Sequence, residues 1–376
     1  MQFGLYLTPQ VEAADEEAPS ITAITEQALA GDEAGFASVY LTEHHFDNYN
    51  AYCDPFLMGA HLAPQLKKAW LSYSVVLLPL THPWRMVESF NTIDQLTGGR
   101  CIFGLGSAGG GLIMTDGLGR TRPNAGRDAS EHIIEVMLQA WAYEGGGPLA
   151  FETAWDGGTL SRPITPAPYR RPHPLLARGT NDAATIERCG RMGWPVMYGR
   201  GDVEVADRFV RLYTQALEGA GHPQGLVDYC KQWMAVTKLI YVGETEEAAQ
   251  RDGMSMLEPY MNQVGFLRVP PIKRNAETAP SLMTERIYFG NSRDDVQRNI
   301  ALIGSPDTVA STLAQYDAVG MRHMRCWFIF GAHCDFAKAN RSFELFVNEV
   351  MPRLNPEPIR EPSAAVAAAA ASHWSV

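Results

Sequence analysis

Residues 72–110, SYSVVLLPLTHPWRMVESFNTIDQLTGGRCIFGLGSAGG, contain the segment that indicates the fold. Leu71 to Leu80 is an almost unbroken apolar run of the kind that forms a strand buried on both faces. Trp84 to Leu96 is expected to form a helix, and Cys101 to Leu105 a second strand. A strand, a helix and a strand in this order predict parallel strands joined by a right-handed crossover.

The same alternation of short apolar runs and longer helical patterns extends along the whole chain. The other expected strands are 3–7, 39–41, 174–177, 195–198, 234–242 and 324–328. The other expected helices are 21–34, 55–66, 124–143, 182–192, 203–218, one from 245, 306–316 and 336–350. Roughly eight strand–helix units predict an α/β fold, the (β/α)8 or TIM barrel, with its active site at the C-terminal ends of the strands. A doubly wound open sheet is the alternative, although it usually needs fewer strands.

We expect one barrel domain over residues 1–354, with insertions in its strand–helix loops. Residues 144–174 hold five Gly and six Pro and form one insertion, with a small hairpin around Asp156. Residues 264–295 are polar, contain proline and form the second insertion, which is the candidate lid over the active site. Residues 355–376 are first Pro-rich and then Ala-rich, so we expect a flexible tail.

Composition and charge are those of an ordinary globular protein. The 376 residues are 46% hydrophobic and 19% charged, which excludes global disorder. The chain has 31 Lys and Arg but 42 Asp and Glu, and no block of positive charge, so we expect no nucleic-acid partner. The start lacks the features of a signal peptide, and no apolar run is long enough to cross a membrane. Six scattered cysteines without a C-x-x-C pair are typical of reduced thiols, so a cytoplasmic enzyme is expected.

Three ionisable residues, Glu43, His44 and His45, directly follow the second expected strand. A barrel has its catalytic residues at such strand ends, and an imidazole can give or take a proton near neutral pH. His44 and His45 are therefore the catalytic candidates. A solvated turn, or a histidine pair satisfied by backbone carbonyls, is the alternative. A zinc site is not expected, because no H-E-x-x-H or H-x-H pattern supplies further ligands.

A glycine-rich loop follows the expected strand at 101–105 and matches G-x-G-x-x-G. A dinucleotide fold is not favoured, because no helix begins on the third glycine and the acidic residue about 20 positions further on lies within a helix. The loop is expected to direct backbone N–H groups toward a cofactor or an anion, through Gly106, Ser107 and Gly109. Ser107 is not an esterase nucleophile, because G-x-S-x-G requires glycine at position 105.

A second anion site is predicted where residues 179–185, GTNDAAT, open a helix. Hydroxyl and amide groups at a helix N-terminus suit a phosphate, and a nearby arginine adds positive charge. The cofactor-binding candidates here are Arg178, Thr180, Asn181, Asp182 and Thr185. A plain N-cap formed by Asn181 or Asp182 is an equally good interpretation.

Several segments, taken in order and spacing, resemble the bacterial luciferase-like, flavin-dependent monooxygenases. They are FGLYL at 3–7, GFASVYLTEHHF at 35–46, the stretch 72–110, PHPLLARGTNDAATIERCGRMGWP at 172–195 and IGSPDTVASTLAQYDAVGMRHMR at 303–325. The resemblance covers about residues 1–353. It implies a (β/α)8 barrel, usually dimeric, that receives reduced flavin from a separate reductase and activates O2 at the flavin.

The resemblance also implies roles for individual residues at the ring of the flavin. His44 corresponds to the catalytic histidine of the family, and Glu43 to the neighbour that braces the flavin ring. Ser74 and Val75 occupy the place where the family often has a non-proline cis peptide beneath the isoalloxazine.

Other positions correspond to the flavin tail and phosphate. Gly106 to Gly109 are implied along the tail, and Thr180 to Thr185 at the phosphate. Where the luciferases carry an arginine that meets the phosphate, this chain has Ser107. The glycine-rich loop and Arg178 are the expected substitutes for that arginine.

The implied function is that of a two-component monooxygenase. Reduced FMN would be supplied in trans by a separate NAD(P)H flavin reductase, with O2 as co-substrate. A small apolar organic substrate would be oxygenated through a C4a-peroxyflavin that must be shielded from water. FMN is expected rather than FAD, because one phosphate site and no second nucleotide-binding motif are visible. A homodimer is also expected.

Two alternative functions stay open. One is a deazaflavin- or flavin-dependent oxidoreductase that transfers hydride and does not use O2. The other is a non-catalytic flavin-binding protein, against which the retained Glu43, His44 and His45 argue.

Overall fold

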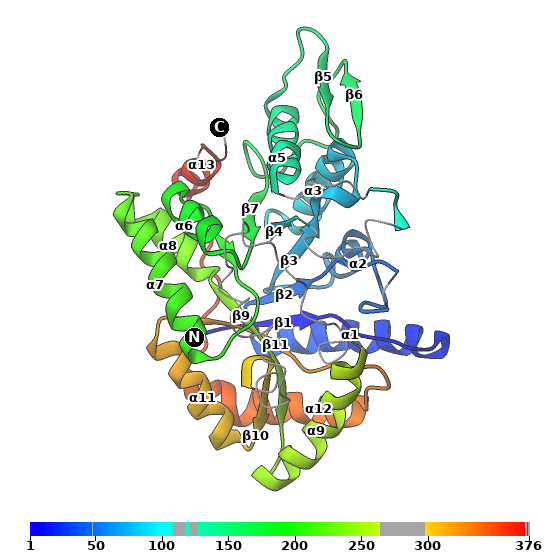
Figure 1. Cartoon of the computed structure of the whole chain (residues 1–376), viewed down its shortest axis with the longest axis vertical. Coiled ribbons are helices and arrows are strands. Elements are labelled where there is room, and N and C mark those ends of the chain that lie inside the picture. The colour runs from blue at the N-terminus through cyan, green and yellow to red at the C-terminus, as the bar shows by residue number, and fades with distance from the viewer. Residues whose placement is uncertain (47, 108–116, 121–126, 264–297, 373, 375–376) are drawn as a thin grey trace, which may run out of the picture.

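A computed structural model describes residues 1–46, 48–107, 117–120, 127–263, 298–372 and 374. Its centre is a nine-stranded sheet with the order β10-β9-β11-β1-β2-β3-β4-β7-β8, in which every pair of neighbours is parallel (Figure 1). The strands are β1 Gln2–Leu7, β2 Ser38–Leu41, β3 Trp70–Leu77, β4 Cys101–Gly106, β7 Leu175–Gly179, β8 Val196–Met197, β9 Ala235–Val242, β10 Ala301–Gly304 and β11 His323–Trp327.

The sheet has the strand order of a (β/α)8 barrel. Strands β1, β2, β3, β4, β7 and β8 are neighbours in chain order, and β9 and β11 lead back to β1. Between β8 and β9 a single backbone hydrogen bond is present, in which Thr237 N donates to Gly199 O at 2.9 Å. The predicted α/β barrel class is therefore confirmed. β10 is an additional strand, paired with the second half of β9.

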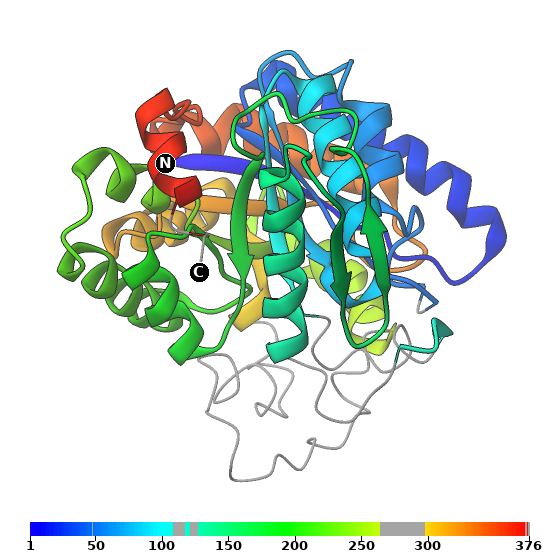
Figure 2. The ribbon, with the colours of Figure 1, turned by 90° about the horizontal axis from the view of Figure 1, so that it is seen from above.

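Helices surround the sheet on its outer side (Figures 1 and 2). They are α1 Ala14–Ala34, α2 Pro55–Leu62, α3 Pro83–Thr97, α5 Arg127–Ala142, α6 Ala183–Met192, α7 Val203–Gly219, α8 Gln224–Gln232, α9 Glu246–Gln263, α11 Pro306–Ala318, α12 Phe336–Leu345 and α13 Ala364–Ser372. All eight residues of β9 are buried, as expected for a strand with helices on one face and the barrel interior on the other. The apolar runs in the sequence thus become the barrel wall.

Local sequence sets the ends of several helices. The side chains of Asp54, Asp202 and Ser305 accept hydrogen bonds from first-turn N–H groups of α2, α7 and α11. Gly35, at the end of α1, has a φ of 91°, which glycine adopts without steric cost. Helix α1 begins seven residues before its predicted start at residue 21, because its acidic first turn suits the positive end of the helix dipole.

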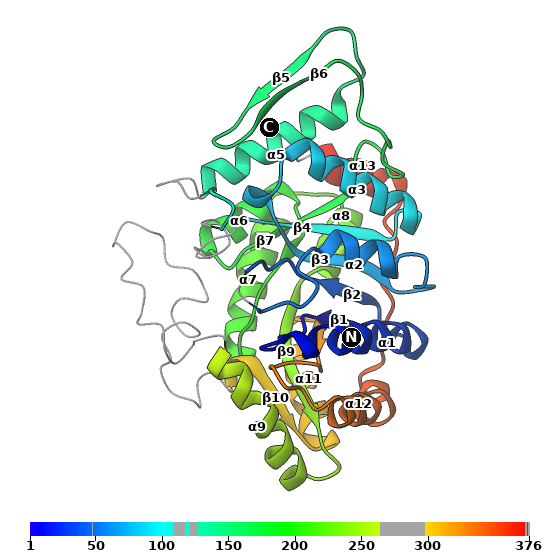
Figure 3. The same ribbon diagram turned by 90° about the vertical axis from the view of Figure 1, so that its right-hand side faces the viewer.

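The first insertion contains the predicted hairpin, which projects from the barrel beside α3 and α5 (Figure 3). Its strands, β5 Leu149–Glu152 and β6 Gly157–Leu160, are antiparallel. An ion pair of 2.6 Å joins Arg120 to Asp156 at the hairpin turn. The second insertion, the predicted lid at 264–295, lies outside the described residues.

Both ends of the chain contact residues near the N-terminal ends of barrel strands. The amino group of Met1 donates to the carbonyl oxygens of Leu354 and Asn355, at 3.3 and 3.2 Å. Near the end of the chain, the Trp374 ring stacks on Trp194 with centroids 4.0 Å apart and an interplanar angle of 7°. The tail therefore contacts the barrel along its length, while its predicted flexibility in solution stays a prediction.

Two further expectations concern helices and thiols. Within the described ranges, none of the helices has the length and hydropathy of a membrane-spanning segment. All six cysteines are free thiols, as their spacing predicted.

Candidate active site

The loop after β2 carries a carboxylate, Glu43, that is buried and held from two sides. Its Oε2 accepts a hydrogen bond from Leu77 N at the end of β3, at 2.6 Å. Its Oε1 lies 3.0 Å from Nε2 of His45, and the Glu43 side chain is only 4% exposed. The carboxylate thus fastens the loop that bears both histidines to the end of the neighbouring strand.

His44 has different surroundings. Its ring packs against Tyr49, with centroids 4.3 Å apart and an interplanar angle of 39°. The hydroxyl of Tyr49 lies 3.2 Å from that of Tyr260 and accepts an N–H of Arg200 at 2.7 Å. One histidine therefore lies beside a carboxylate, and the other beside an aromatic cluster.

The Ser74–Val75 peptide bond of β3 is cis, at the position that the resemblance indicates. Ser74 Oγ accepts a hydrogen bond from Arg325 of β11. The same guanidinium donates to the carbonyl oxygens of Gly199 and Ala235, at 3.3 and 3.2 Å. Arg325, in the middle of β11, therefore links β3, β9 and the segment after β8 across the barrel interior.

Val75 fills space that two glycines of neighbouring strands leave open. A Cβ at Gly106, in β4, would lie 2.3 Å from Val75 Cγ2. A Cβ at Gly179, in β7, would lie 2.2 Å from Val75 Cγ1. Because Gly106 and Gly179 have no side chain, Val75 fits between them. Of the other residues predicted in the glycine-rich loop, Ser107 follows β4 and is half-buried, and Gly109 lies outside the described residues.

The N-terminus of α6 is capped by the chain itself. Asp182 Oδ2 accepts from Thr185 N and from Thr185 Oγ1, at 2.9 and 2.6 Å, and Thr180 Oγ1 accepts from Asp182 N at 3.1 Å. Asn181 Oδ1 accepts from Gly199 N at 2.9 Å and so joins this loop to the end of β8. The N-cap interpretation describes this geometry, and a phosphate at the same helix end would meet the Asp182 carboxylate. The phosphate role of these residues stays a prediction.

Arg178 forms an ion pair with a neighbouring helix. Its guanidinium donates to Glu131 Oε1 of α5 at 2.9 Å and to the carbonyl oxygen of Leu105 at 3.1 Å. The side chain is 4% exposed, and Glu131 neutralises its charge. This arrangement joins β7 to α5, and the predicted role of Arg178 at a phosphate stays a prediction.

Below the strand ends, the barrel interior contains a buried histidine, His323. Its Nε2 lies 3.2 Å from Ser38 Oγ and 3.3 Å from Tyr40 Oη, and its Nδ1 lies 2.9 Å from the carbonyl oxygen of Gln232. Burial lowers the pKa of His323 to about 4, only partly offset by the Gln232 carbonyl. His323 is therefore neutral at pH 7 and belongs to the barrel core.

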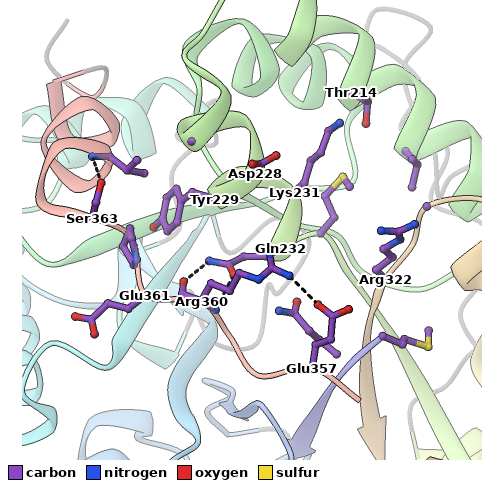
Figure 4. Close-up of a pocket in the computed structure, with 18 residues that line it drawn as sticks. Thr214, Asp228, Tyr229, Lys231, Gln232, Arg322, Glu357, Arg360, Glu361 and Ser363 are labelled. Carbon is purple, nitrogen blue, oxygen red and sulfur yellow. Dashed lines mark hydrogen bonds and ion pairs between the residues drawn. The ribbon is translucent and has the colours of Figure 1, made fainter. Parts of the chain in front are cut away.

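A cavity of about 690 Å³ lies at the opposite end of the barrel, where the tail crosses (Figure 4). It is lined by residues at the starts of β1, β9 and β11 and by the segment before α13, among them Gln232, Arg322, Glu357 and Arg360. Gln232 and Arg360 exchange two hydrogen bonds of 3.0 Å across it. Barrel enzymes carry their active sites at the C-terminal strand ends, so this cavity is separate from the candidate active site.

The sequence did not single out Arg200 or Arg325 as site residues. Arg200 follows β8 by three residues, and Arg325 lies within β11. For Arg325 the sequence did contain a signal, since it lies inside a predicted buried strand. An arginine is rarely buried without a partner, so its position indicates a specific contact. Across the described part of the chain, no cluster of three or more His, Cys, Asp or Glu is arranged to hold a metal ion.

A family model described as luciferase-like monooxygenase matches residues 1–323. The chain belongs to the luciferase-like monooxygenase family. The alkanal monooxygenase alpha chain of Photorhabdus luminescens is 30% identical over 367 residues, which cover 94% of this chain and 97% of that relative. The 4-hydroxyprotoasukamycin monooxygenase of Streptomyces nodosus subsp. asukaensis is 24% identical over 368 residues, 94% of this chain and 92% of the relative. The predicted family is confirmed, and the chain is an enzyme of this family.

Solved structures show the same fold. Monooxygenase RslO1 from Streptomyces bottropensis has a TM-score of 0.73 at 22% identity, covering 94% of this chain and 99% of its own. The oxygenating constituent of 3,6-diketocamphane monooxygenase from Pseudomonas putida, in complex with FMN, has a TM-score of 0.65 at 19% identity, covering 95% and 100%. An F420-dependent secondary alcohol dehydrogenase has a TM-score of 0.66 at 16% identity, covering 96% and 99%.

The cofactor that this family implies is a flavin, and the residues around Ser74 suit its ring. Nε of Arg325 is a buried N–H without a hydrogen-bond acceptor. A buried cation with an unused donor suits a ring that is rich in acceptors and becomes anionic when it is reduced. Near the predicted phosphate end, the Asp182 and Glu131 carboxylates accept hydrogen bonds from Thr185 and Arg178, and the phosphate contacts of this segment stay a prediction.

Proposed function

We propose that this chain is the oxygenating component of a two-component flavin monooxygenase. It would take reduced FMN from a separate NAD(P)H flavin reductase and use O2 to oxygenate a small organic substrate with an apolar body. When bound, reduced FMN supplies the two electrons with which O2 is activated. We also propose that the chain acts as a homodimer.

The observation that carries the proposal is the different environment of the two histidines. Glu43 binds His45 and Leu77 N and so fixes the loop beside the Ser74–Val75 peptide. His44 is left to face the aromatic cluster around Tyr49. An imidazole is the usual side chain for moving a proton at neutral pH, so we assign proton transfer at a ring nitrogen to His44. His45 and Glu43 position it.

Buried aromatic side chains lie on one side of this site. Trp327 and Tyr260 are fully buried, and their rings meet edge to face with centroids 5.4 Å apart. Tyr49 packs against the same tryptophan at 6.1 Å. An apolar wall of this kind would slow the loss of activated oxygen as H2O2 and suits an apolar substrate body.

Hydride transfer with a deazaflavin is the second candidate function. It is favoured by the likeness of the fold to an F420-dependent secondary alcohol dehydrogenase. A hydride-transfer enzyme consumes no O2, so oxygen consumption separates the two functions.

The test measures oxygen consumption and product formation with a flavin reductase, NADH, FMN and a panel of candidate compounds under isotopically labelled O2. We expect label in the product with the native chain. His44→Ala should retain FMN binding but reduce product by about 100-fold or more, while H2O2 per reduced flavin rises. His45→Ala, the matched control, should lose less activity and more stability. Unlabelled product, or unchanged coupling in His44→Ala, would overturn the proposal.

A further inference from the structure

Arg200, at the C-terminal end of the barrel, has a positive charge that no described carboxylate neutralises. One N–H of its guanidinium donates to Tyr260 Oη, and another to Tyr49 Oη at 2.7 Å. Within the described part of the chain, no aspartate or glutamate lies at ion-pair distance from Arg200. Since an arginine keeps its proton at all physiological pH values, this half-buried charge is permanent.

Aromatic rings surround this guanidinium. Its Cζ lies 5.5 Å from the centroid of Trp327 and 5.7 Å from that of Tyr260. The Tyr6 ring packs against the same tryptophan at 5.1 Å. The fully buried Trp327 and Tyr260 rings back the cation from the barrel interior, close to Tyr49 and therefore to His44. A ligand here would be flat and apolar, with a polar group directed at Arg200.

The tyrosines do not neutralise the cation. Burial raises the pKa of Tyr49 well above its ordinary value, and burial likewise raises the pKa of Tyr6 and Tyr260. All three are therefore neutral phenols at pH 7. A second guanidinium, that of Arg325, lies across the Tyr6 ring at 5.7 Å and donates only to a hydroxyl and carbonyl oxygens. Two positive charges thus act on this end of the barrel.

We propose that Arg200, held by Tyr49 and Tyr260 and backed by the buried Trp327 ring, forms the subsite for an acidic oxygen of the organic substrate. The substrate class is a flat, largely apolar compound that bears a carboxylate, phenolate or enolate. A partly buried charge without a counter-ion is costly, and a charge-assisted hydrogen bond to an oxyanion offsets that cost. The inference rests on the proposed function only in taking an organic substrate to bind beside His44.

The FMN phosphate is the other oxyanion that could reach Arg200, and the experiment separates the two sources. Affinities of 2-naphthoate and its neutral isostere 2-naphthamide are measured by titration calorimetry at pH 7, without O2 or reductase. Affinities of FMN and riboflavin are measured in parallel. The proteins are the native chain, Arg200→Met, Arg200→Lys and the control Arg211→Met, which removes an arginine that is 78% exposed on α7.

We expect the native chain and Arg211→Met to bind naphthoate about 10- to 100-fold more tightly than naphthamide, as one charge-assisted hydrogen bond predicts. Arg200→Met should lose this preference at an unchanged melting temperature, and Arg200→Lys should keep part of it. Equal affinities of the native chain for the two probes would overturn the inference. So would an Arg200→Met variant that weakens FMN but not riboflavin, because the cation would then bind the phosphate. Since no turnover is involved, failure of oxygenation and failure of this subsite are distinguishable.

Discussion

Gly179→Ala should destabilise the protein by forcing Val75 out of the space between β4 and β7. The new Cβ would lie 2.2 Å from Val75 Cγ1, whereas ordinary contacts begin near 3.4 Å. Val75 cannot turn away easily, because it is β-branched and its other methyl group, Cγ2, already fills the space beside Gly106, 2.3 Å from where a Cβ at that position would lie. Overpacking of this kind costs about 1–3 kcal/mol.

The assay is urea denaturation of the native chain, Gly179→Ala, Val75→Ala and the double variant. Removing the valine methyl groups makes room for the new Cβ, so the double variant should be more stable than the sum of the single effects by about 1–2 kcal/mol. The control is Gly219→Ala at the end of α7, where a Cβ meets no atom within 4 Å, and it should be neutral or slightly stabilising. Additive effects, or a Gly179→Ala variant as stable as the control, would refute the packing described for Val75.

Three further predictions concern the site, the core and the tail. Glu43→Ala should cost about 2–4 kcal/mol, because it removes charged hydrogen bonds from a buried loop, whereas Glu88→Ala, in the exposed pair with Arg85, should cost less than about 1 kcal/mol. Urea denaturation measures both, and equal costs would contradict the anchoring role. The unfolded pKa of His323 is near its ordinary value of 6.5, and the folded pKa is about 4. The unfolded state therefore binds more protons between these pH values, and the free energy of unfolding decreases as the pH is lowered. About 2 kcal/mol should be lost from this group between pH 7 and pH 5, and a His323→Gln variant with the native pH slope would contradict it. Trp374→Ala should cost about 3 kcal/mol or more and expose the tail to limited proteolysis, because Trp374 stacks on Trp194, and an uncut variant would contradict the docking.

The barrel could be predicted because its signals are local. Strands buried on both faces are continuous apolar runs, and β3, α3 and β4 succeed one another within one stretch of sequence. The elements not predicted are β10, α8 and α13. β10 has only four residues, and α8 follows α7 closely. α13 is almost entirely alanine, so its sequence contains no apolar stripe to show which face packs.

The sequence predicts where the candidate site lies, but not which residues contact one another in it. Glu43, His44 and His45 follow a strand, which places them at the active end of a barrel. Their separate roles depend on Leu77 N, which lies 34 residues further along the chain and is brought near by strand pairing. The importance of Arg200 depends on which charges lie around it in space, and no sequence pattern reports that.

The central claim, that this chain binds reduced FMN and directs its reaction with O2, is tested most directly by rapid mixing. Anaerobic protein with equimolar reduced FMN is mixed with oxygenated buffer, and the flavin absorbance and H2O2 are followed together; reduced F420 is the parallel sample. We predict that bound FMN is reoxidised more slowly than free reduced FMN, with delayed H2O2 release, and that reduced F420 is not bound. Reoxidation at the rate of free reduced FMN, together with binding of reduced F420, would contradict the account.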